Sequence, residues 1–221
     1  MSYMREAKEN PKSVSRLLKA TEEFVRNTLS EAEAGHDWWH VQRVWNNAKM
    51  LAKSEAVDIV VVELAALLHD IADSKFHNGD EEIGPEKAGA FLRSQDVDED
   101  VIIHVQEIIR NMSFKASFGE VSFHSKELEV VQDADRLDAI GAIGIARAFT
   151  YGGFKNRELY NPELKPNLNM TREEYKKSSS PTINHFYEKL LLLKDKMNTV
   201  SGRRIAEERH AVMEAYLEQC Y

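Results

Sequence analysis

The sequence has little cysteine, a shortage of positive charge and no long apolar run, and each shortage excludes a class of protein. Its one cysteine, Cys220, cannot form an intramolecular disulfide, so packing rather than a disulfide must stabilise the fold. A single cysteine is also typical of proteins in a reducing compartment. Acidic residues number 37 against 29 Lys and Arg, and a surface with a formal charge of −8 repels duplex nucleic acid. The acidic excess therefore argues against duplex binding.

The apolar runs are too short or too interrupted for a membrane. The longest, "IVVVELAALL" at 59–68, is broken by Glu63, and the first residues carry charges where a signal peptide has an apolar core. We therefore expect a cytoplasmic protein that is neither secreted nor membrane-bound. With 221 residues, the chain is long enough for one sizeable core and short for two, so we expect a single domain over 1–221.

Helical periodicity runs through most of the chain. Apolar residues recur at helical spacing in 14–29, 41–52, 99–112 and 126–140, and no pair of alternating strands is recognisable. The β-branched start of 58–69 allows a strand, but its length and its continuation "ELAALL" favour a buried helix. The sequence thus predicts an all-α fold.

One segment, 151–181, differs from the rest in composition. It gathers glycine, proline and asparagine residues, which are typical of a loop. A surface insertion and a flap over an active site both remain open for it. Amphipathic helix returns at 182–219, where one face is expected to hold Ile205, Arg209, Val212, Met213, Tyr216 and Leu217.

Three predicted helices each direct a polar group toward the core. His40 lies on the apolar face of its helix, Asp135 follows an apolar stripe, and "LLHDIADSKF" ends an apolar run with the adjacent pair His69 and Asp70. Burying such groups separately is costly, whereas a shared cation offsets the cost. Two imidazoles and two carboxylates suit a divalent transition metal.

Other interpretations exist for each residue alone. His40 could be a hydrogen-bonded core histidine, and Asp135 could pair with Arg136. His36 and His40, one turn apart, could also form a small zinc site. That zinc site would leave the adjacent His69 and Asp70 unexplained, so the shared metal accounts for more of the sequence.

The order "HVQRV", "LLHDIAD" and "DADRLDAIGAIG" resembles the HD-domain metal-dependent phosphohydrolases, and the similarity is greatest to the small bacterial stand-alone members. The resemblance covers most of the chain and implies an all-helical HD-domain fold with its metal site between core helices. The motif core would span about 36–150, and C-terminal helices about 182–219. By this resemblance His40, His69, Asp70 and Asp135 are the metal ligands.

The resemblance also implies a role for Asp73, which matches an acidic position that some members use for proton transfer. Three residues after Asp70, it could orient or deprotonate the attacking water, or simply pair with Lys75 at a helix end. Arg43 and Lys75 are the cations nearest in sequence for substrate phosphates. Manganese, cobalt, nickel or iron suits the mixed shell better than magnesium.

The reaction that the resemblance implies is the hydrolysis of a nucleoside triphosphate to monophosphate and pyrophosphate. A dinuclear iron oxygenase on the same fold is an alternative that needs His104 and His124 as further ligands, and we favour one metal because a single histidine more often has a structural role. A noncatalytic nucleotide sensor would tolerate loss of ligands that this chain retains. The expected partner is a phosphorylated small molecule, and a homodimer is left open.

Overall fold

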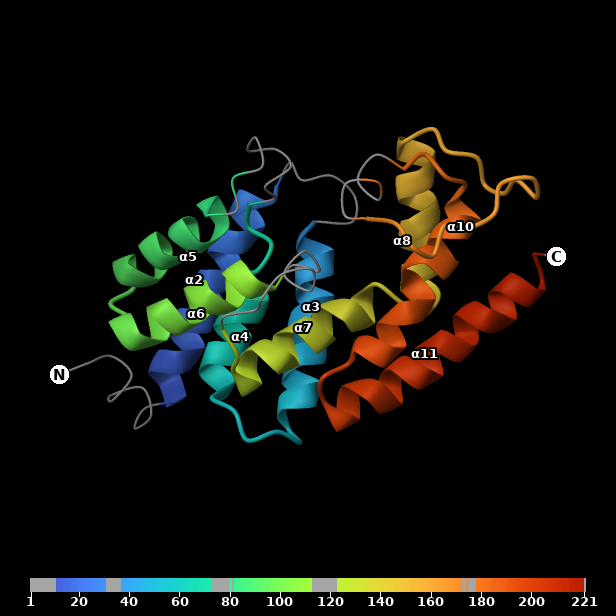
Figure 1. Ribbon diagram of the computed structural model, residues 1–221. Coiled ribbons are helices and arrows are strands. Elements are labelled where there is room, and N and C mark those ends of the chain that lie inside the picture. The colour runs from blue at the N-terminus through green and yellow to red at the C-terminus, as the bar shows by residue number, and fades with distance from the viewer. Residues whose placement is uncertain are drawn as a thin grey trace. The chain divides into compact units, whose positions relative to one another are not determined.

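The computed structural model describes residues 11–30, 37–72, 80, 82–112, 123–171, 174 and 178–220. These residues fold into helices with no strand among them, which confirms the all-α prediction. The chain divides into two compact units, 1–132 and 133–221, whose helices are labelled in Figure 1. None of the helices in the described part of the chain has the length and apolar character needed to cross a bilayer.

The first unit is built around one short, almost entirely apolar helix. Its helices are α2 (Pro11–Thr28), α3 (Trp38–Ala52), α4 (Ile59–Leu68), α5 (Ile83–Ser94) and α6 (Glu99–Asn111). Helix α4 contacts α2, α3 and α6, so it is covered on several sides and buries seven of its ten residues. This surrounding explains its uniform apolar sequence, and the strand alternative for 58–69 is excluded.

Aspartate side chains cap the starts of α3 and α4, and the end of α4 leads directly to two of the predicted ligands. The carboxylate of Asp37 accepts a hydrogen bond from the backbone N–H of His40 at 3.0 Å and so caps the start of α3. Asp58 caps α4 in the same way through Val60, also at 3.0 Å. Helix α4 ends at Leu68 with His69 as its C-cap, so the adjacent histidine and aspartate follow the apolar helix directly, as predicted.

Helix α7 (Lys126–Asp138) begins in the first unit and ends in the second. The hydroxyl of Ser125 accepts a hydrogen bond from the N–H of Leu128 at 3.0 Å, so Ser125 caps the start of this helix. Leu128 and Val131 are buried, whereas Asp135 on the same stripe is half-buried. Gly141 follows with φ of +73°, a backbone conformation that glycine adopts without strain.

The second unit holds α8 (Gly141–Phe154), α10 (Thr182–Glu188), the 3₁₀ helix η3 (Leu190–Lys196) and α11 (Val200–Glu218). Helix α11 packs against α8 and η3. Two boundaries differ from the sequence prediction. The loop predicted from 151 begins later, because α8 includes 151–154, and the helix predicted after 182 is a seven-residue α-helix followed by η3.

The predicted apolar face of α11 is partly wrong. Met213 and Leu217 are buried, but Val212 is 47% exposed. The small residues Gly202 and Ala206 occupy the buried face instead. Periodicity identified the helix, and the contacts that α11 makes with its neighbours decided which side is covered.

The segment that follows α8 is held against the start of α10. The N–H groups of Thr182 and Ile183 donate to the carbonyls of Glu158 and Leu159 at 2.9 and 3.1 Å. The side-chain amide of Asn184 donates to the carbonyl of Leu164 at 2.9 Å. Hydrogen bonds from both backbone and side chain therefore hold this part of the predicted loop within its own unit, and its proposed role as a flap stays a prediction.

Candidate metal centre

His69 is oriented by the helix that it terminates. Its Nδ1 lies 2.9 Å from the backbone carbonyl oxygen of Ala66, three residues earlier in α4. A carbonyl oxygen only accepts, so Nδ1 must carry the proton, and the neutral ring then has its lone pair on Nε2. That Nε2 is buried and has no hydrogen-bond partner among the residues that the structure describes. A buried acceptor without a partner is costly unless a cation or donor meets it.

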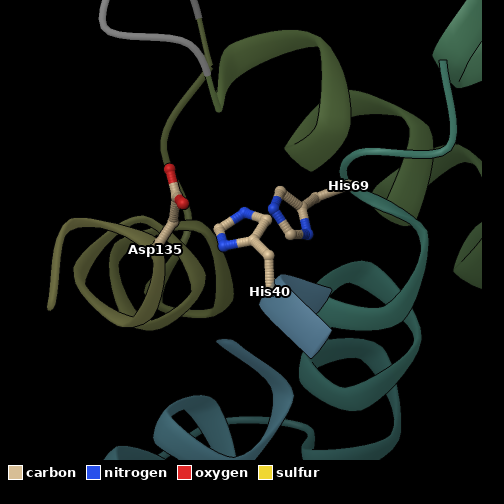
Figure 2. A group of neighbouring side chains, drawn as sticks. All are labelled: His40, His69 and Asp135. Carbon is tan, nitrogen blue, oxygen red and sulfur yellow. The ribbon is translucent and has the colours of Figure 1, made fainter. Parts of the chain in front are cut away.

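Two other potential ligands lie beside His69. One ligand atom each from His40, His69 and Asp135 falls within 4.8 Å of the others, and Figure 2 shows the three side chains gathered together. His40 is only 1% exposed, and its ring meets that of His69 edge to face with centroids 5.4 Å apart. Two imidazoles and a carboxylate at this spacing could hold a divalent metal ion.

Asp70 borders this group without being one of its three members. Its Oδ2 lies 3.8 Å from Nε2 of His40, and the side chain is mostly buried, with 17% exposure. The structure therefore brings a second carboxylate to the edge of the group. Its assignment as a fourth ligand stays a prediction.

Helix α7 carries two buried acids that the sequence reasoning missed. Asp133 is completely buried, and burial raises the pKa of its carboxyl, although hydrogen bonds from the N–H groups of Asn198 and Thr199 act in the opposite direction. Asp138 is 2% exposed and accepts a hydrogen bond from Arg147 at 2.7 Å. Both acids therefore have donor partners supplied by their own unit.

The two histidines of the dinuclear alternative lie elsewhere. Nε2 of His104 is 3.0 Å from the hydroxyl of Ser125 and 3.6 Å from a carboxylate oxygen of Glu127. His124 is exposed. Neither belongs to the ligand group found in the described part of the chain, and the preference for a single metal stays a prediction.

Of the other residues predicted for the site, the structure describes Arg43 but not the rest. Arg43 lies on α3, one turn beyond Trp39, and is half-buried. Asp73, Lys75 and His36 fall outside the described residues, so their predicted roles stay predictions. Asp37 was missed, although an aspartate three residues before His40 is a recognisable helix-capping signal.

Comparison with known proteins gives a consistent result. The HD domain family model matches residues 38–140, a range that includes every residue of the group. The protein YpgQ of Bacillus subtilis strain 168 is 37% identical over 202 residues, which are 89% of this chain and 88% of YpgQ. The chain belongs to the HD-domain family. The prediction from the motif order is therefore confirmed.

Solved structures of HD-domain relatives superpose along most of the chain. A Lactobacillus plantarum protein is 39% identical with a TM-score of 0.78, covering 91% of this chain and 93% of its own. A Bacillus thuringiensis HD-superfamily hydrolase is 42% identical with a TM-score of 0.73, covering 93% and 95%. YpgQ in complex with ADP is 34% identical over the aligned structure, with a TM-score of 0.74 and coverage of 94% and 95%.

These similarities determine the general class of the protein. HD domains bind divalent metals, and the chain presents a group of side chains that could do so. A structural relative is an HD-superfamily hydrolase. Together they support a metal-dependent hydrolase, while the bond that is cleaved depends on the surroundings of the site.

Proposed function

We propose that this HD-domain protein is a phosphohydrolase that acts on nucleotides and splits a nucleoside triphosphate into monophosphate and pyrophosphate. The observation that carries the proposal is the buried Nε2 of His69, which lies beside His40 and Asp135 and meets no hydrogen-bond partner in the described part of the chain. Such an arrangement suits a metal-assisted attack on phosphorus. The ADP complex of the relative YpgQ supports a nucleotide as the ligand.

The metal would be held by His40, His69 and Asp135, with Asp70 as the fourth ligand. When bound, a divalent cation supplies Lewis acidity, which polarises a phosphoryl oxygen and makes water a better nucleophile. The fixed Nδ1–H of His69 presents Nε2 as the ligand atom, and the bond to Ala66 prevents the ring from turning away. The mixed nitrogen and oxygen ligands favour manganese, cobalt, nickel or iron over magnesium.

The chain's other residues would handle charge and protons. In the proposed reaction a water oxygen bonds to the α-phosphorus, the bond from that phosphorus to the bridging oxygen breaks, and pyrophosphate leaves. Asp73 would orient the water and accept its proton. Arg43 and Lys75 would offset the negative charge of the phosphates.

A dinuclear oxygenase and a nucleotide sensor remain as competing functions. The oxygenase requires His104 and His124 at a second metal, and His104 already lies within hydrogen-bond distance of Ser125. The sensor requires no intact ligand set. The retained group of His40, His69 and Asp135 therefore favours hydrolysis by a single metal site.

The test is a panel of nucleotides incubated with metal-loaded protein, with phosphate and pyrophosphate measured separately. His69→Ala and Asp70→Ala should abolish turnover and sharply lower the bound metal while keeping the helical content. His124→Ala, which removes an exposed histidine outside the group, is the matched control and should retain both. Full metal occupancy in the His69 and Asp70 variants, measured by elemental analysis, would contradict the proposed metal site.

A further inference from the structure

Helix α3 carries all three tryptophans of the chain, and they differ in their surroundings. Trp38 is 7% exposed, with the guanidinium of Arg26 lying 4.2 Å from the ring centre. Trp45 donates its indole N–H to Glu63 at 2.8 Å. Trp39 is 58% exposed and makes no hydrogen bond, ion pair or ring contact with the residues that the structure describes.

A single exposed apolar side chain is common on protein surfaces and needs no explanation by itself. The position of Trp39 is what makes it informative. It directly precedes His40 in the first turn of α3, which the hydrogen bond from His40 N–H to Asp37 holds in place. Neighbouring Cα atoms are about 3.8 Å apart, and successive helical side chains diverge by roughly 100°. The indole and the imidazole of the metal group therefore start from adjacent backbone positions and leave α3 roughly 100° apart, the indole toward solvent and the imidazole toward the core.

The same helix also supplies a cation on the side of Trp39. Arg43 lies four residues later, and residues at this spacing are neighbours on one helical face. Two turns of one helix thus present an imidazole of the metal group, an exposed aromatic ring and a guanidinium. These three groups match the three chemical parts of a metal-bound nucleotide, namely the coordinating phosphates, the π face of the base and the remaining phosphate charge.

We infer that Trp39 is the platform on which the base of the nucleotide stacks when its phosphates lie at His40. This inference rests on the proposed function and adds to it the residue that holds the base. Every nucleobase has a π face, so stacking gives affinity with weak discrimination between bases. The larger purine ring system should gain more from the indole than a pyrimidine does.

The inference is tested by binding rather than turnover. Isothermal titration calorimetry with metal-loaded protein would compare ADP, CDP and inorganic tripolyphosphate as probes, for wild type, Trp39→Ala, Trp39→Phe and Met50→Ala. Met50 is the matched control, because it is an apolar residue of α3 that is 40% exposed but lies near the other end of the helix. Metal content and helical content are measured on each preparation.

Trp39→Ala should weaken ADP binding roughly tenfold or more and CDP binding less, the scale expected for losing an aromatic stack. Tripolyphosphate affinity, metal content and the Met50→Ala protein should be unchanged, and Trp39→Phe should recover most of the loss. Recovery by phenylalanine would mark the ring, rather than the size of the side chain, as the important feature.

Each contrary result has a distinct meaning. Unchanged ADP affinity in Trp39→Ala overturns the inference, and a simultaneous change in oligomeric state would assign the residue to a protein interface instead. Equal losses for ADP and tripolyphosphate also overturn it, because the damage would then lie at the phosphate or metal site. A wild-type protein that binds none of the three probes refutes the proposed function, whereas a wild-type protein that binds all three, with no loss of ADP affinity in Trp39→Ala, refutes only the stacking.

Discussion

Asp133→Ala should destabilise the protein because its buried carboxylate caps the start of α11. The carboxylate accepts hydrogen bonds from the N–H of Asn198 at 2.9 and 3.0 Å, from the N–H of Thr199 at 2.7 Å and from the Thr199 hydroxyl at 2.8 Å. The same hydroxyl accepts a hydrogen bond from the N–H of Gly202 at 2.9 Å, inside the first turn of α11. One side chain therefore ties the start of α11 to α7.

The size of the effect depends on which of these donors water can reach. Thr199 is 5% exposed, so its N–H would be left without an acceptor, at a cost of about 1–3 kcal/mol. Asn198 is exposed, so water can replace the carboxylate there and the net loss is only about 0.5–1.5 kcal/mol. A total of roughly 1.5–4.5 kcal/mol would be a large share of the ~5–15 kcal/mol that stabilises a typical domain.

Gly202 provides a second arm of the same experiment. A Cβ at this position would lie 2.6 Å from Oδ2 of Asp133 and 2.7 Å from Oγ1 of Thr199. Gly202→Ala should therefore destabilise, although the same change in an open helix stabilises by about 1 kcal/mol. Removing the Asp133 carboxylate relieves the nearer contact, so the penalty for Gly202→Ala should shrink in the double variant.

Urea unfolding followed by far-UV circular dichroism measures all three variants. The control is Glu208→Ala, which removes an ion pair to Arg204 whose side chains are 66% and 68% exposed and should change stability by less than ~1 kcal/mol. Additivity of the Asp133 and Gly202 effects within about 0.5 kcal/mol would refute the predicted contact. A loss below ~1 kcal/mol for Asp133→Ala would refute its capping role.

Three further predictions concern protons and metal. Asp73→Asn should keep normal metal content and lower turnover by roughly a hundredfold or more, the scale of losing a general acid or base; near-normal turnover in the metal-replete variant would leave Asp73 as an ordinary helix-end acid. His124→Ala should keep about one metal per chain by elemental analysis, and two metals per wild-type chain falling to one in the variant would favour the dinuclear alternative. Burial, with the positive charges of Lys189 and Arg157, lowers the pKa of His185 from 6.5 to about 3. The unfolded chain therefore binds this proton first as the pH falls, and stability that is complete above about pH 6.5 is lost toward pH 3. Between pH 7.5 and pH 5, the free energy of unfolding measured in urea should fall by roughly 2 kcal/mol less in His185→Gln than in wild type. An equal fall in both proteins would contradict this pKa.

Local pattern was sufficient to predict most of the helices and the polar groups that they direct inward, while the resemblance to the HD-domain family supplied the grouping of His40, His69 and Asp135. A helix such as α4, covered on several sides, needs apolar residues all round, and its abrupt end at His69 marks a polar site. His40 could be placed inward because helical spacing alone relates it to the apolar face of α3. These inferences required no knowledge of distant contacts.

Sequence reasoning did not find the features that depend on contacts between residues distant in the chain. Asp133 accepts hydrogen bonds from Asn198 and Thr199, which lie 65 and 66 positions later in the chain. No local sequence pattern predicts such a contact. The exposure of Val212 likewise depends on which neighbours cover α11. The tautomer of His69 lies between these cases, because the carbonyl three residues earlier is always present but its use depends on how the helix ends.

The geometry of α7 explains how one helix can serve both structure and chemistry. Two residues apart on a helix correspond to roughly 200°, so Asp133 and Asp135 leave on nearly opposite sides. Asp133 is completely buried and its hydrogen bonds hold the start of α11, while Asp135 is half-buried and lies with the two histidines. Because the two carboxylates face different partners, the stability lost in Asp133→Ala and the metal lost in a ligand variant are separable effects. A folded Asp133→Ala protein with normal metal content would agree with this division of roles, and loss of metal from the still-folded variant would contradict it.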